Sequence, residues 1–581
     1  MKKGRLYCLF ALLAVLPAAV FGGCGQRADE GGDPVYDDGI GHYHKYSQTL
    51  QMRVGQWVAD EKNFPEGQTP EKNDMYDLVE KHTNIKIVPA VKVSVGQTFY
   101  DRINELQMSD ALPDMTAMDT KTFRDAVEAE QLADLTDVFE QYASPTLKRV
   151  IGSNNGLYMD LGSSGGKLYG IPRPATLLDG VSVAWIRKDW IEIADWHNGE
   201  GGLAPRTFEE LESLAYAFKN RIGAIASATD VSNPYPIAMY KDLVTPFMGI
   251  MNAHKAYPGA FIRAEAGGEI KYGTFTPETA AGFKTLNKYQ SDGIFSSDWA
   301  TKATTDIAAE SAQGRVGIFI DEFWAPLANQ LQGLMGVALS DNPGRLAGAD
   351  WICVPMPAMA GETMESYSRA EPLEYYAVNK DFYNKEALVI LMNFIVEKYN
   401  AEGTRENGLG AYFPFETEYK ELDGKYSGRS IFNWLPVIID DPQKNILYSD
   451  SLVRAAASGD PAELTGEVRG YYDIMTGNPT TAKERLDKWV WNRIYGEGGS
   501  VQAAKRLTAN LVPNAYLGAP TPAMNASYAY LKNTLELNRS IQIVTTSMSD
   551  SQLSAAMNKF KGDWESNGGA KILEEINRLA A

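Results

Sequence analysis

The amino-acid sequence predicts an α/β fold in which parallel-rich sheets are flanked by helices. Strand-like and helix-like patterns alternate from about residue 49 to residue 400, which is typical of parallel sheets connected by helices. The chain has 581 residues, of which 44% are hydrophobic and 11% aromatic. This length and composition indicate a large globular body of two to four domains.

The first elements are a strand, a helix and a second strand. Leu50, Met52 and Val54 alternate with polar residues in "TLQMRVGQWV" and therefore share one face of a predicted strand. The helical pattern "EKNDMYDLVEKH" follows, and then the strand pattern "TNIKIVPAVKV". This order predicts a βαβ unit.

The alternation continues with the strand "LPDMTAM", the helix "KTFRDAVEAEQL", the turn "GGKLYGIPRP" and the strand "GVSVAWIRKDW". In "APRTFEELESLAYAFKN", Thr207 is expected to cap a helix, with Glu210 as its capping-box partner. The apolar stripe of this helix should pack in the core. Its members are Phe208, Leu211, Leu214, Ala215 and Phe218.

The later elements follow the same pattern. The segment "GRVGIFIDEFW" predicts a short buried strand that ends in an acidic and aromatic loop. A strand "EYYAVNKD" then leads to the buried helix "KEALVILMNFIVEKY". From about residue 400 on, we expect helices separated by glycines.

The N-terminus has the pattern of a secretory signal over residues 1–23. Basic residues precede the apolar run 6–20, which has 15 residues and is shorter than the roughly 20 needed to span a bilayer. Gly22 and Gly23 precede Cys24, an arrangement that resembles a bacterial lipoprotein signal. The resemblance implies that Cys24 carries lipid. Residues 24–45 are polar and Gly-rich and predict a flexible tether.

Net charge and cysteine content bear on nucleic-acid binding and on disulfide formation. The formal net charge of -19 makes nucleic acid an unexpected partner. Of the three cysteines, Cys8 leaves with the signal and Cys24 takes lipid, so that Cys353 alone remains in the folded body. No internal disulfide is then possible, and we expect Cys353 to be a buried small hydrophobe.

Seven blocks in order resemble the extracellular solute-binding proteins of carbohydrate ABC transporters, and among them the long lipoproteins of the LipO type. The blocks are "LPDMTAMDTKTFRDAVEAEQLADLTDVF", "GGKLYGIPRP", "VAWIRKDWIEIA", "PRTFEELESLAYAFK", "GRVGIFIDEFW", "YAVNKDFYNKEALVILMNFI" and the stretch from "SIQIVTTSMSD" to "GGAKILEEINRL". The resemblance implies the two-lobed periplasmic-binding-protein-like fold (type II), with a hinge of two or three crossing segments. The N-terminal lobe would comprise residues 46–180 and about 373–435, and the C-terminal lobe about 181–372 and 436–581.

Ligands of such sheets sit beyond the carboxyl ends of the strands. The ligand-binding candidates, which follow strands or supply aromatic faces, are Trp57, Asp119, Arg173, Asp321, Trp324 and Trp434. Aromatic rings beside charged hydrogen-bonding groups suit a sugar, whose C–H faces pack on rings and whose hydroxyls need directed partners.

Each candidate also has a structural alternative. The two tryptophans Trp57 and Trp434 could be core packing, the two aspartates could cap helices or loops, and Arg173 could anchor the hinge. For Trp324 the resemblance implies stacking on the sugar. The "RKDW" motif that begins at Arg187 is expected to be structural.

The resemblance implies a monomeric binding protein on the extracellular face of the cytoplasmic membrane, of Gram-positive type and lipid-anchored. It would capture an oligosaccharide and deliver it to the permease subunits of an ABC importer. Many relatives carry an acidic calcium loop after the "AFK" helix, but this chain reads "AFKNRIGAIASATD", so we expect no metal and no cofactor. A secreted glycan-active hydrolase and a receptor that feeds a sensor kinase are the alternatives. No H-E-x-x-H helix and no phosphate loop occurs in the sequence, which favours a protein that is not an enzyme.

Overall fold

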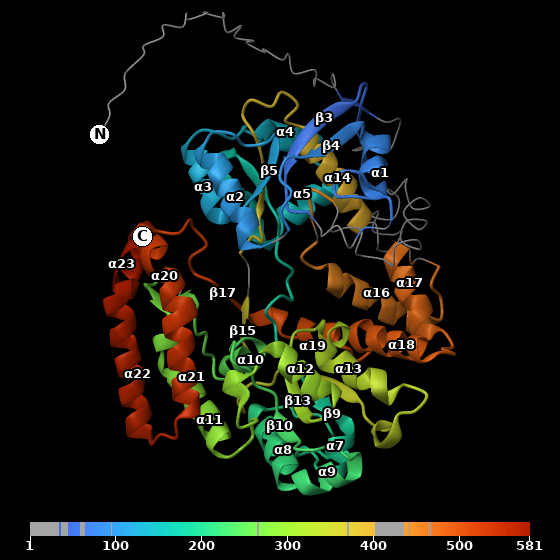
Figure 1. Cartoon of the computed structure of the whole chain (residues 1–581), viewed down its shortest axis with the longest axis vertical. Helices are drawn as coiled ribbons and strands as arrows, with labels where there is room; N and C mark the ends of the chain where they lie inside the picture. Colours follow the sequence, from blue (N-terminus) through green and yellow to red (C-terminus); the bar gives the residue numbers. More distant parts are fainter. Residues whose placement is uncertain are drawn as a thin grey trace, which may run out of the picture.

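The structure, a computed structural model, describes residues 34–36, 44–58, 64, 66–94, 96–263, 267–368, 371–400, 435–439, 441–462, 464 and 466–580. The described residues form two lobes, each with its own sheet and hydrophobic core. The C-terminal helices, residues 522–580, form a column beside the lobe that is drawn at the bottom of Figure 1. The predicted two-lobed α/β fold class is confirmed. No helix among these residues is long and apolar enough to cross a bilayer.

The N-lobe is built on a five-stranded sheet in the order β4-β3-β5-β16-β8. Its strands are β3 (Leu50–Gly55), β4 (Ile85–Pro89), β5 (Met115–Met118), β8 (Gly170–Pro172) and β16 (Tyr375–Val378). β3 runs parallel to β4 and β5, whereas β16 is antiparallel to β5 and β8. The helices of this lobe are α1 (Asp74–Thr83), α2 (Gln97–Met108), α3 (Thr120–Glu128), α4 (Thr136–Tyr142), α5 (Pro145–Ile151), α6 (Leu157–Gly162) and α14 (Ala387–Asn400). A short hairpin of β6 (Ser163–Ser164) and β7 (Lys167–Leu168) precedes β8.

The predicted βαβ unit is β3–α1–β4. The side chain of Asn73 caps α1 by accepting a hydrogen bond from the backbone N–H of Tyr76 (3.0 Å). Asn84 ends the helix in the left-handed conformation, which asparagine tolerates. The strand then alternates, with Leu50, Met52 and Val54 buried as expected.

A small sheet precedes β3 inside the segment predicted to be a tether. β1 (Pro34–Tyr36) pairs antiparallel with β2 (His44–Tyr46). Tyr46 is buried and donates its hydroxyl hydrogen bond to Glu386 (2.7 Å), so the chain is fixed to the N-lobe from β2 on. The predicted signal and Cys24 lie outside the described residues.

The C-lobe contains a four-stranded sheet in the order β10-β13-β9-β14. Its strands are β9 (Val183–Arg187), β10 (Tyr235–Ile237), β13 (Val316–Asp321) and β14 (Trp351–Pro355). β10 and β13 are parallel, but β9 is antiparallel to both of its neighbours. Both lobes therefore have mixed sheets, because β9 and β16 enter their lobes from the other lobe, without a helical crossover connection.

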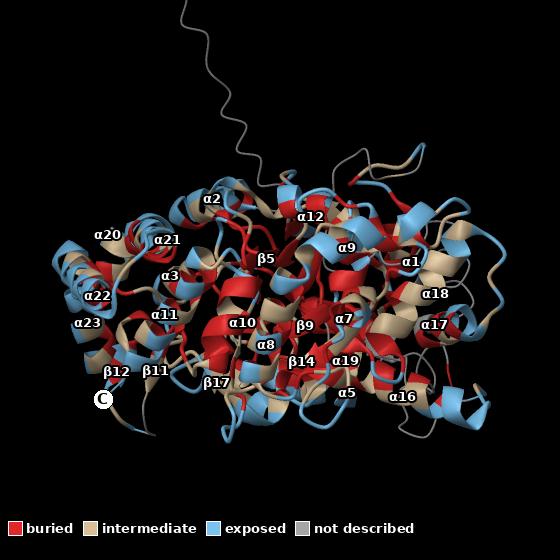
Figure 2. Ribbon diagram, turned by 90° about the horizontal axis from the view of Figure 1, so that it is seen from below, coloured by how far each residue is buried: buried red, intermediate tan, exposed pale blue. Residues whose placement is uncertain are grey.

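Helices cover this sheet and extend the lobe. The first of them are α7 (Lys188–Ala194), α8 (Phe208–Asn220), α9 (Ile222–Thr229), α10 (Thr245–Ala253), α11 (Pro277–Ser291), α12 (Thr304–Ala312) and α13 (Asn329–Ala338). The later helices are α16 (Lys444–Ser458), α17 (Gly466–Thr476), α18 (Ala482–Tyr495), α19 (Ser500–Lys505), α20 (Pro522–Tyr530), α21 (Leu537–Thr545), α22 (Asp550–Trp564) and α23 (Ala570–Ala580). Two small sheets pair β11 (Phe261–Arg263) with β12 (Ile270–Tyr272) and β15 (Ser366–Ser368) with β17 (Leu511–Pro513). Figure 2 shows β9 and β14 in the buried interior and the exposed faces of α22 and α23 at the periphery.

The helix α8 tests the predicted capping box. Thr207 caps it as expected, accepting a hydrogen bond from the backbone N–H of Glu210 (3.2 Å), and the whole predicted apolar stripe is buried. The carboxylate of Glu210 accepts instead from the backbone N–H groups of Arg206 (2.8 Å) and Gly199 (3.2 Å). It therefore fixes the preceding loop rather than the cap residue. Cys353 on β14 is half-buried, and burial raises the pKa of its thiol.

Three segments pass between the lobes and are hydrogen-bonded to one another. The backbone N–H of Arg173 donates to the carbonyl oxygen of Glu374 (2.8 Å), and that of Leu373 donates to the carbonyl oxygen of Arg173 (3.0 Å). The N–H of Leu177 donates to the carbonyl oxygen of Pro442 (2.8 Å). These contacts tie the crossing segments into one hinge.

Candidate functional site

The carboxyl ends of the N-lobe strands lie at one edge of the sheet. β3, β5 and β8 run in the same direction, so Trp57, Asp119 and Arg173, which follow them, all lie at this edge. Trp57 is half-buried and packs against the N-lobe core. Asp119 caps α3, its carboxylate accepting a hydrogen bond from the backbone N–H of Thr122 (2.7 Å). The structure thus brings three of the six predicted residues to the same edge, with Asp119 also in its alternative capping role.

Arg173 takes part in a buried network at the hinge. Its guanidinium forms an ion pair with Glu374 (3.2 Å), whose side chain is 1% exposed. The hydroxyl of Tyr376 donates to the same carboxylate (2.6 Å) and accepts from the backbone N–H of Ile438 (2.9 Å). Within the described residues the second carboxylate oxygen of Glu374 has no hydrogen-bond partner. The network therefore links all three crossing segments and leaves one acceptor unused.

Tyr100 is a further polar residue at this edge. Burial raises the pKa of its phenol, and the charge of Glu374 raises the pKa further, while Arg173 lowers it. Asp119 also acts on the pKa of Tyr100. Tyr100 therefore lies close to both predicted charged residues of the N-lobe. Its position in the helix segment "QTFYDRINELQM" gave no sequence signal for this role.

In the C-lobe, Asp321 and Trp324 lie at the carboxyl end of β13. Asp321 is 3% exposed, and its carboxylate accepts a hydrogen bond from the backbone N–H of Glu322 (2.8 Å). Burial raises its pKa to about 7, and the neighbouring charge of Glu322 acts in the same direction. The hydroxyl of Thr245 opposes this shift. Asp321 is thus a buried carboxyl group behind the surface of the lobe.

Trp324 has the opposite environment. Its side chain is 36% exposed, and its indole N–H donates to a carboxylate oxygen of Glu322 (2.9 Å). The hydrogen bond restrains the ring while about a third of the residue remains accessible to solvent. An exposed aromatic face held rigidly in this way is suited to stacking on a ligand.

A cavity of about 360 Å³ opens next to this edge, between α10 and the C-terminal helices. Ser182 and Thr245 belong to its lining. Ser182 precedes β9, whose first residue pairs with Asp321, so the cavity adjoins the same end of the sheet. Only eight residues of chain separate Arg173 from Ser182. The candidate site of each lobe therefore lies next to the hinge.

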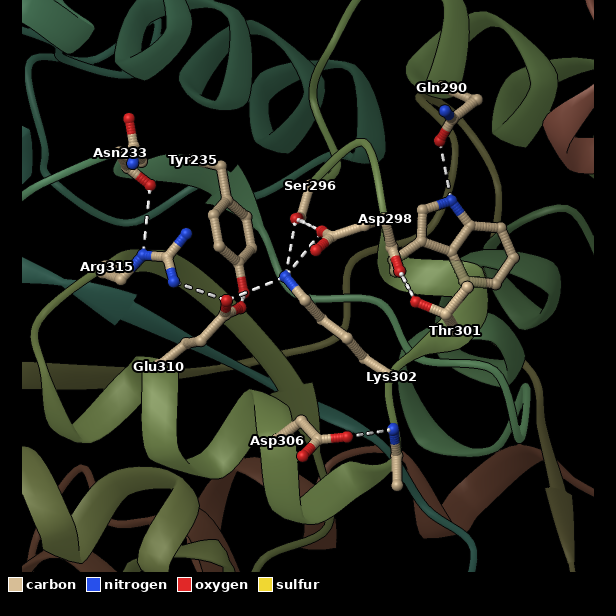
Figure 3. Close-up of polar contacts among 12 residues, drawn as sticks. Asn233, Tyr235, Gln290, Ser296, Asp298, Thr301, Lys302, Asp306, Glu310 and Arg315 are labelled. Carbon is tan, nitrogen blue, oxygen red and sulfur yellow. Dashed lines mark hydrogen bonds and ion pairs between the residues drawn. The ribbon is translucent and has the colours of Figure 1, made fainter.

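A second polar cluster, at the opposite end of the C-lobe sheet, is structural (Figure 3). Glu310 accepts hydrogen bonds from Arg315 (2.5 Å), Tyr235 (2.7 Å) and Lys302 (2.8 Å). Tyr235 and Arg315 stand at the beginnings of β10 and β13, away from the edge that carries Asp321. Because each charged group of this cluster has partners within it, the cluster holds the sheet to α12.

The described part of the chain contains no group of three or more His, Cys, Asp or Glu side chains that could hold a metal ion. Trp434 lies outside the described residues, so its predicted role in ligand binding stays a prediction. The roles of the other five candidates also stay predictions, grouped in two sets next to the hinge.

Comparison with solved structures gives the same two-lobed fold. A solute-binding protein from Bifidobacterium longum subsp. infantis has a TM-score of 0.57 at 15% identity, covering 91% of this chain and 98% of the other. An HMO-binding, ABC-transporter-associated solute-binding protein from Bifidobacterium longum infantis has a TM-score of 0.56 at 15% identity, covering 91% and 99%. A substrate-binding protein of S. pneumoniae in complex with kestose has a TM-score of 0.53 at 13% identity, covering 91% and 98%.

No curated protein sequence matches the chain. The profile of the family described as "Bacterial extracellular solute-binding protein" matches residues 62–400, which is more than half of the chain and includes the whole C-lobe sheet and the N-lobe sheet except β3. Together with the two lobes and the hinge of crossing segments, this match shows that the chain belongs to the bacterial extracellular solute-binding protein family.

Proposed function

We propose that this protein is the membrane-anchored, extracellular substrate-binding protein of an ABC importer, and that it captures an oligosaccharide between its lobes. The observation that carries the proposal is the exposed indole of Trp324, fixed by Glu322 at the carboxyl end of β13. A sugar ring packs its C–H face on such a surface. The names of two similar structures, which bind HMO and kestose, support a glycan as the ligand class.

The N-lobe would supply the directed polar contacts. Arg173 and Tyr100 lie together at the edge of its sheet, beside the unused acceptor oxygen of Glu374. Hydroxyl groups of a sugar both donate and accept hydrogen bonds, and this set offers donors and an acceptor. A ligand that touches both sets favours the closed arrangement of the lobes through its differential contacts. The permease would then distinguish the loaded protein from the empty one by its closed form.

We infer that the ligand is bound without chemical turnover. A glycoside hydrolase uses two carboxyl groups on either side of the scissile bond, roughly 5–9.5 Å apart. The carboxylate of Asp119 is engaged in capping α3, and Asp321 is buried behind the surface. This arrangement of the two predicted carboxylates supports binding rather than hydrolysis.

Trp324→Ala should weaken oligosaccharide binding by about thirtyfold. The loss of an aromatic anchor costs about 2 kcal/mol or more, and each 1.4 kcal/mol corresponds to a factor of about ten. Calorimetric titration measures the effect with an oligosaccharide identified on a glycan array. Tyr383→Ala is the control, because Tyr383 is 69% exposed and follows the end of β16 that is paired with the start of β5. Equal affinities of Trp324→Ala and wild type would overturn the role of Trp324.

The anchor is proposed from the sequence alone. Acyl chains contribute about 0.8 kcal/mol per buried CH₂, so several chains on Cys24 would hold the protein on a membrane. Cys24→Ala should therefore release a folded protein into the medium. Mass spectrometry of the mature N-terminus checks this, and an unacylated first residue other than Cys24 would contradict it.

A further inference from the structure

The cavity beside α10 has the size of a ligand pocket, and a π-helical turn forms one of its walls. It has a volume of about 360 Å³, within the roughly 300–1,000 Å³ range of ligand pockets. α10 lies between the C-lobe sheet and the column of C-terminal helices (Figure 1). The opposite wall comes from the π-helical turn Leu531–Glu536. Such turns are rare and are frequent at functional sites.

Two buried polar side chains in this cavity have no partner in the described part of the protein. Asn252 is 1% exposed, and both its carboxamide oxygen and its carboxamide nitrogen lack hydrogen bonds. Ser182 is also 1% exposed, and its hydroxyl is unpaired. Both residues line the cavity. Burial of unpaired polar groups costs stability, and a partner that enters the cavity and reaches these two side chains would remove this cost.

Asn287 is the contrasting case. It is buried to 6% exposure, and its carboxamide nitrogen donates to the carbonyl oxygens of Ile543 (2.7 Å) and Thr546 (2.5 Å). That asparagine joins α11 to α21 and does not line the cavity. The chain therefore satisfies a buried carboxamide where it serves the fold, and leaves one free at the cavity.

The charges of the cavity favour a neutral ligand. The charged residues of the lining are Asp242, Glu536 and Lys532. The carboxyl group of Glu536 accepts hydrogen bonds from Tyr272 (2.6 Å) and Thr274, and burial raises its pKa. With Glu536 protonated or ionised, the lining has no excess of positive charge that could offset an entering anionic group.

Apolar side chains complete the lining. Leu243 and Met248 are among the lining residues. A carboxamide offers one acceptor and two donors in a fixed fork, which matches two adjacent hydroxyl groups. A sugar ring presents such hydroxyls at its edge and C–H groups at its face.

We propose that this cavity is a subsite for one neutral sugar ring of the bound oligosaccharide, with Asn252 and Ser182 hydrogen-bonding its hydroxyl groups. The proposal rests on the proposed function and makes it more specific. It assigns the selectivity for uncharged over uronate-containing glycans to the cavity between α10 and the turn Leu531–Glu536.

The test begins with a glycan array of neutral and uronate-containing oligosaccharides, probed with the full-length protein. Neutral glycans should bind, and titration of the strongest one should give at least tenfold weaker binding for Asn252→Ala. Asn252→Leu should also lose binding, while the melting temperature of the ligand-free protein stays equal or rises, because an unpaired buried group is removed. Asn287→Ala is the matched control: its melting temperature should fall and its affinity should remain unchanged.

Each other outcome is informative. If the Asn252 variants bind within twofold of wild type while Trp324→Ala is impaired, the subsite is overturned and the proposed function stands. A lower melting temperature of ligand-free Asn252→Leu would show that Asn252 is structural and would overturn the subsite too. Preferred binding of uronates would overturn the assigned selectivity. If wild type binds no glycan on the array, the proposed function itself fails.

Discussion

Arg187→Ala should lower the free energy of unfolding by about 3–5 kcal/mol, the typical cost of removing one partner of a buried ion pair. The Arg187 side chain is 0% exposed and forms two hydrogen bonds to Asp189, of 2.8 and 2.6 Å. A third goes to the carbonyl oxygen of Gly314 (3.1 Å). The guanidinium also lies 5.2 and 5.8 Å from the ring centroids of Trp190 and Trp351. The substitution therefore leaves Asp189 without its cation and opens a space between two indoles.

Urea unfolding measures this effect. Arg206→Ala is the control, because Arg206 is 46% exposed and its ion pair with Glu200 lies at the surface. Exposed ion pairs contribute little to stability because water and salt screen them, so this variant should unfold close to wild type. Oligosaccharide affinity should be unchanged in both variants. A loss of affinity in Arg187→Ala without a loss of stability would contradict the structural role expected for the "RKDW" motif.

Asp321→Asn should stabilise the protein progressively as the pH rises from about 4 to 7. The folded state raises the pKa of Asp321 from 3.8 to about 7, mainly because the group is buried. In this window the folded state binds a proton that the unfolded state has released, so the stability contributed by the protonated group is full below pH 4 and is lost toward pH 7. At about 1.4 kcal/mol per pKa unit, the stability of the variant relative to wild type should rise by on the order of 4 kcal/mol between pH 4 and pH 8. Asparagine keeps an acceptor for the N–H of Glu322 and carries no charge.

The measurement is the difference in urea-unfolding free energy between variant and wild type at pH 4, 6 and 8. Asp298→Asn should behave with the opposite sign, because hydrogen bonds from Lys302 and Ser296 lower the pKa of Asp298. The ionised carboxylate of Asp298 stabilises the fold at neutral pH, and this contribution is lost as the pH falls. Asp298→Asn should therefore lower the free energy of unfolding at pH 8. A pH-independent difference for Asp321→Asn would show that Asp321 is ionised in the folded protein.

Local patterns predicted the elements that depend on neighbouring residues. The alternation of Leu50, Met52 and Val54 and the cap of α8 at Thr207 are encoded within a few positions, and both are confirmed. The antiparallel direction of β9 could not be predicted in this way. The direction of β9 depends on where the crossing segment enters the C-lobe, and a pattern of a few residues does not determine that position.

The candidate site was accessible to sequence reasoning only in part. An acidic residue after a strand can point to solvent or into the core, and Asp321 is buried although its position suggested a ligand contact. Glu374 meets Arg173 across about 200 positions of sequence, so its role depends on the pairing of two crossing segments. Asn252 stands in an apolar helix pattern, and only the cavity reveals that its carboxamide is unpaired.

The central claim is that two lobes close on a sugar held between them. Small-angle X-ray scattering tests it directly on the protein with and without a saturating oligosaccharide selected on the glycan array. We expect a smaller radius of gyration in the bound state, because a ligand that contacts both lobes favours their closed arrangement. An unchanged radius of gyration, with binding demonstrated by calorimetry in the same sample, would contradict the two-lobed receptor described here.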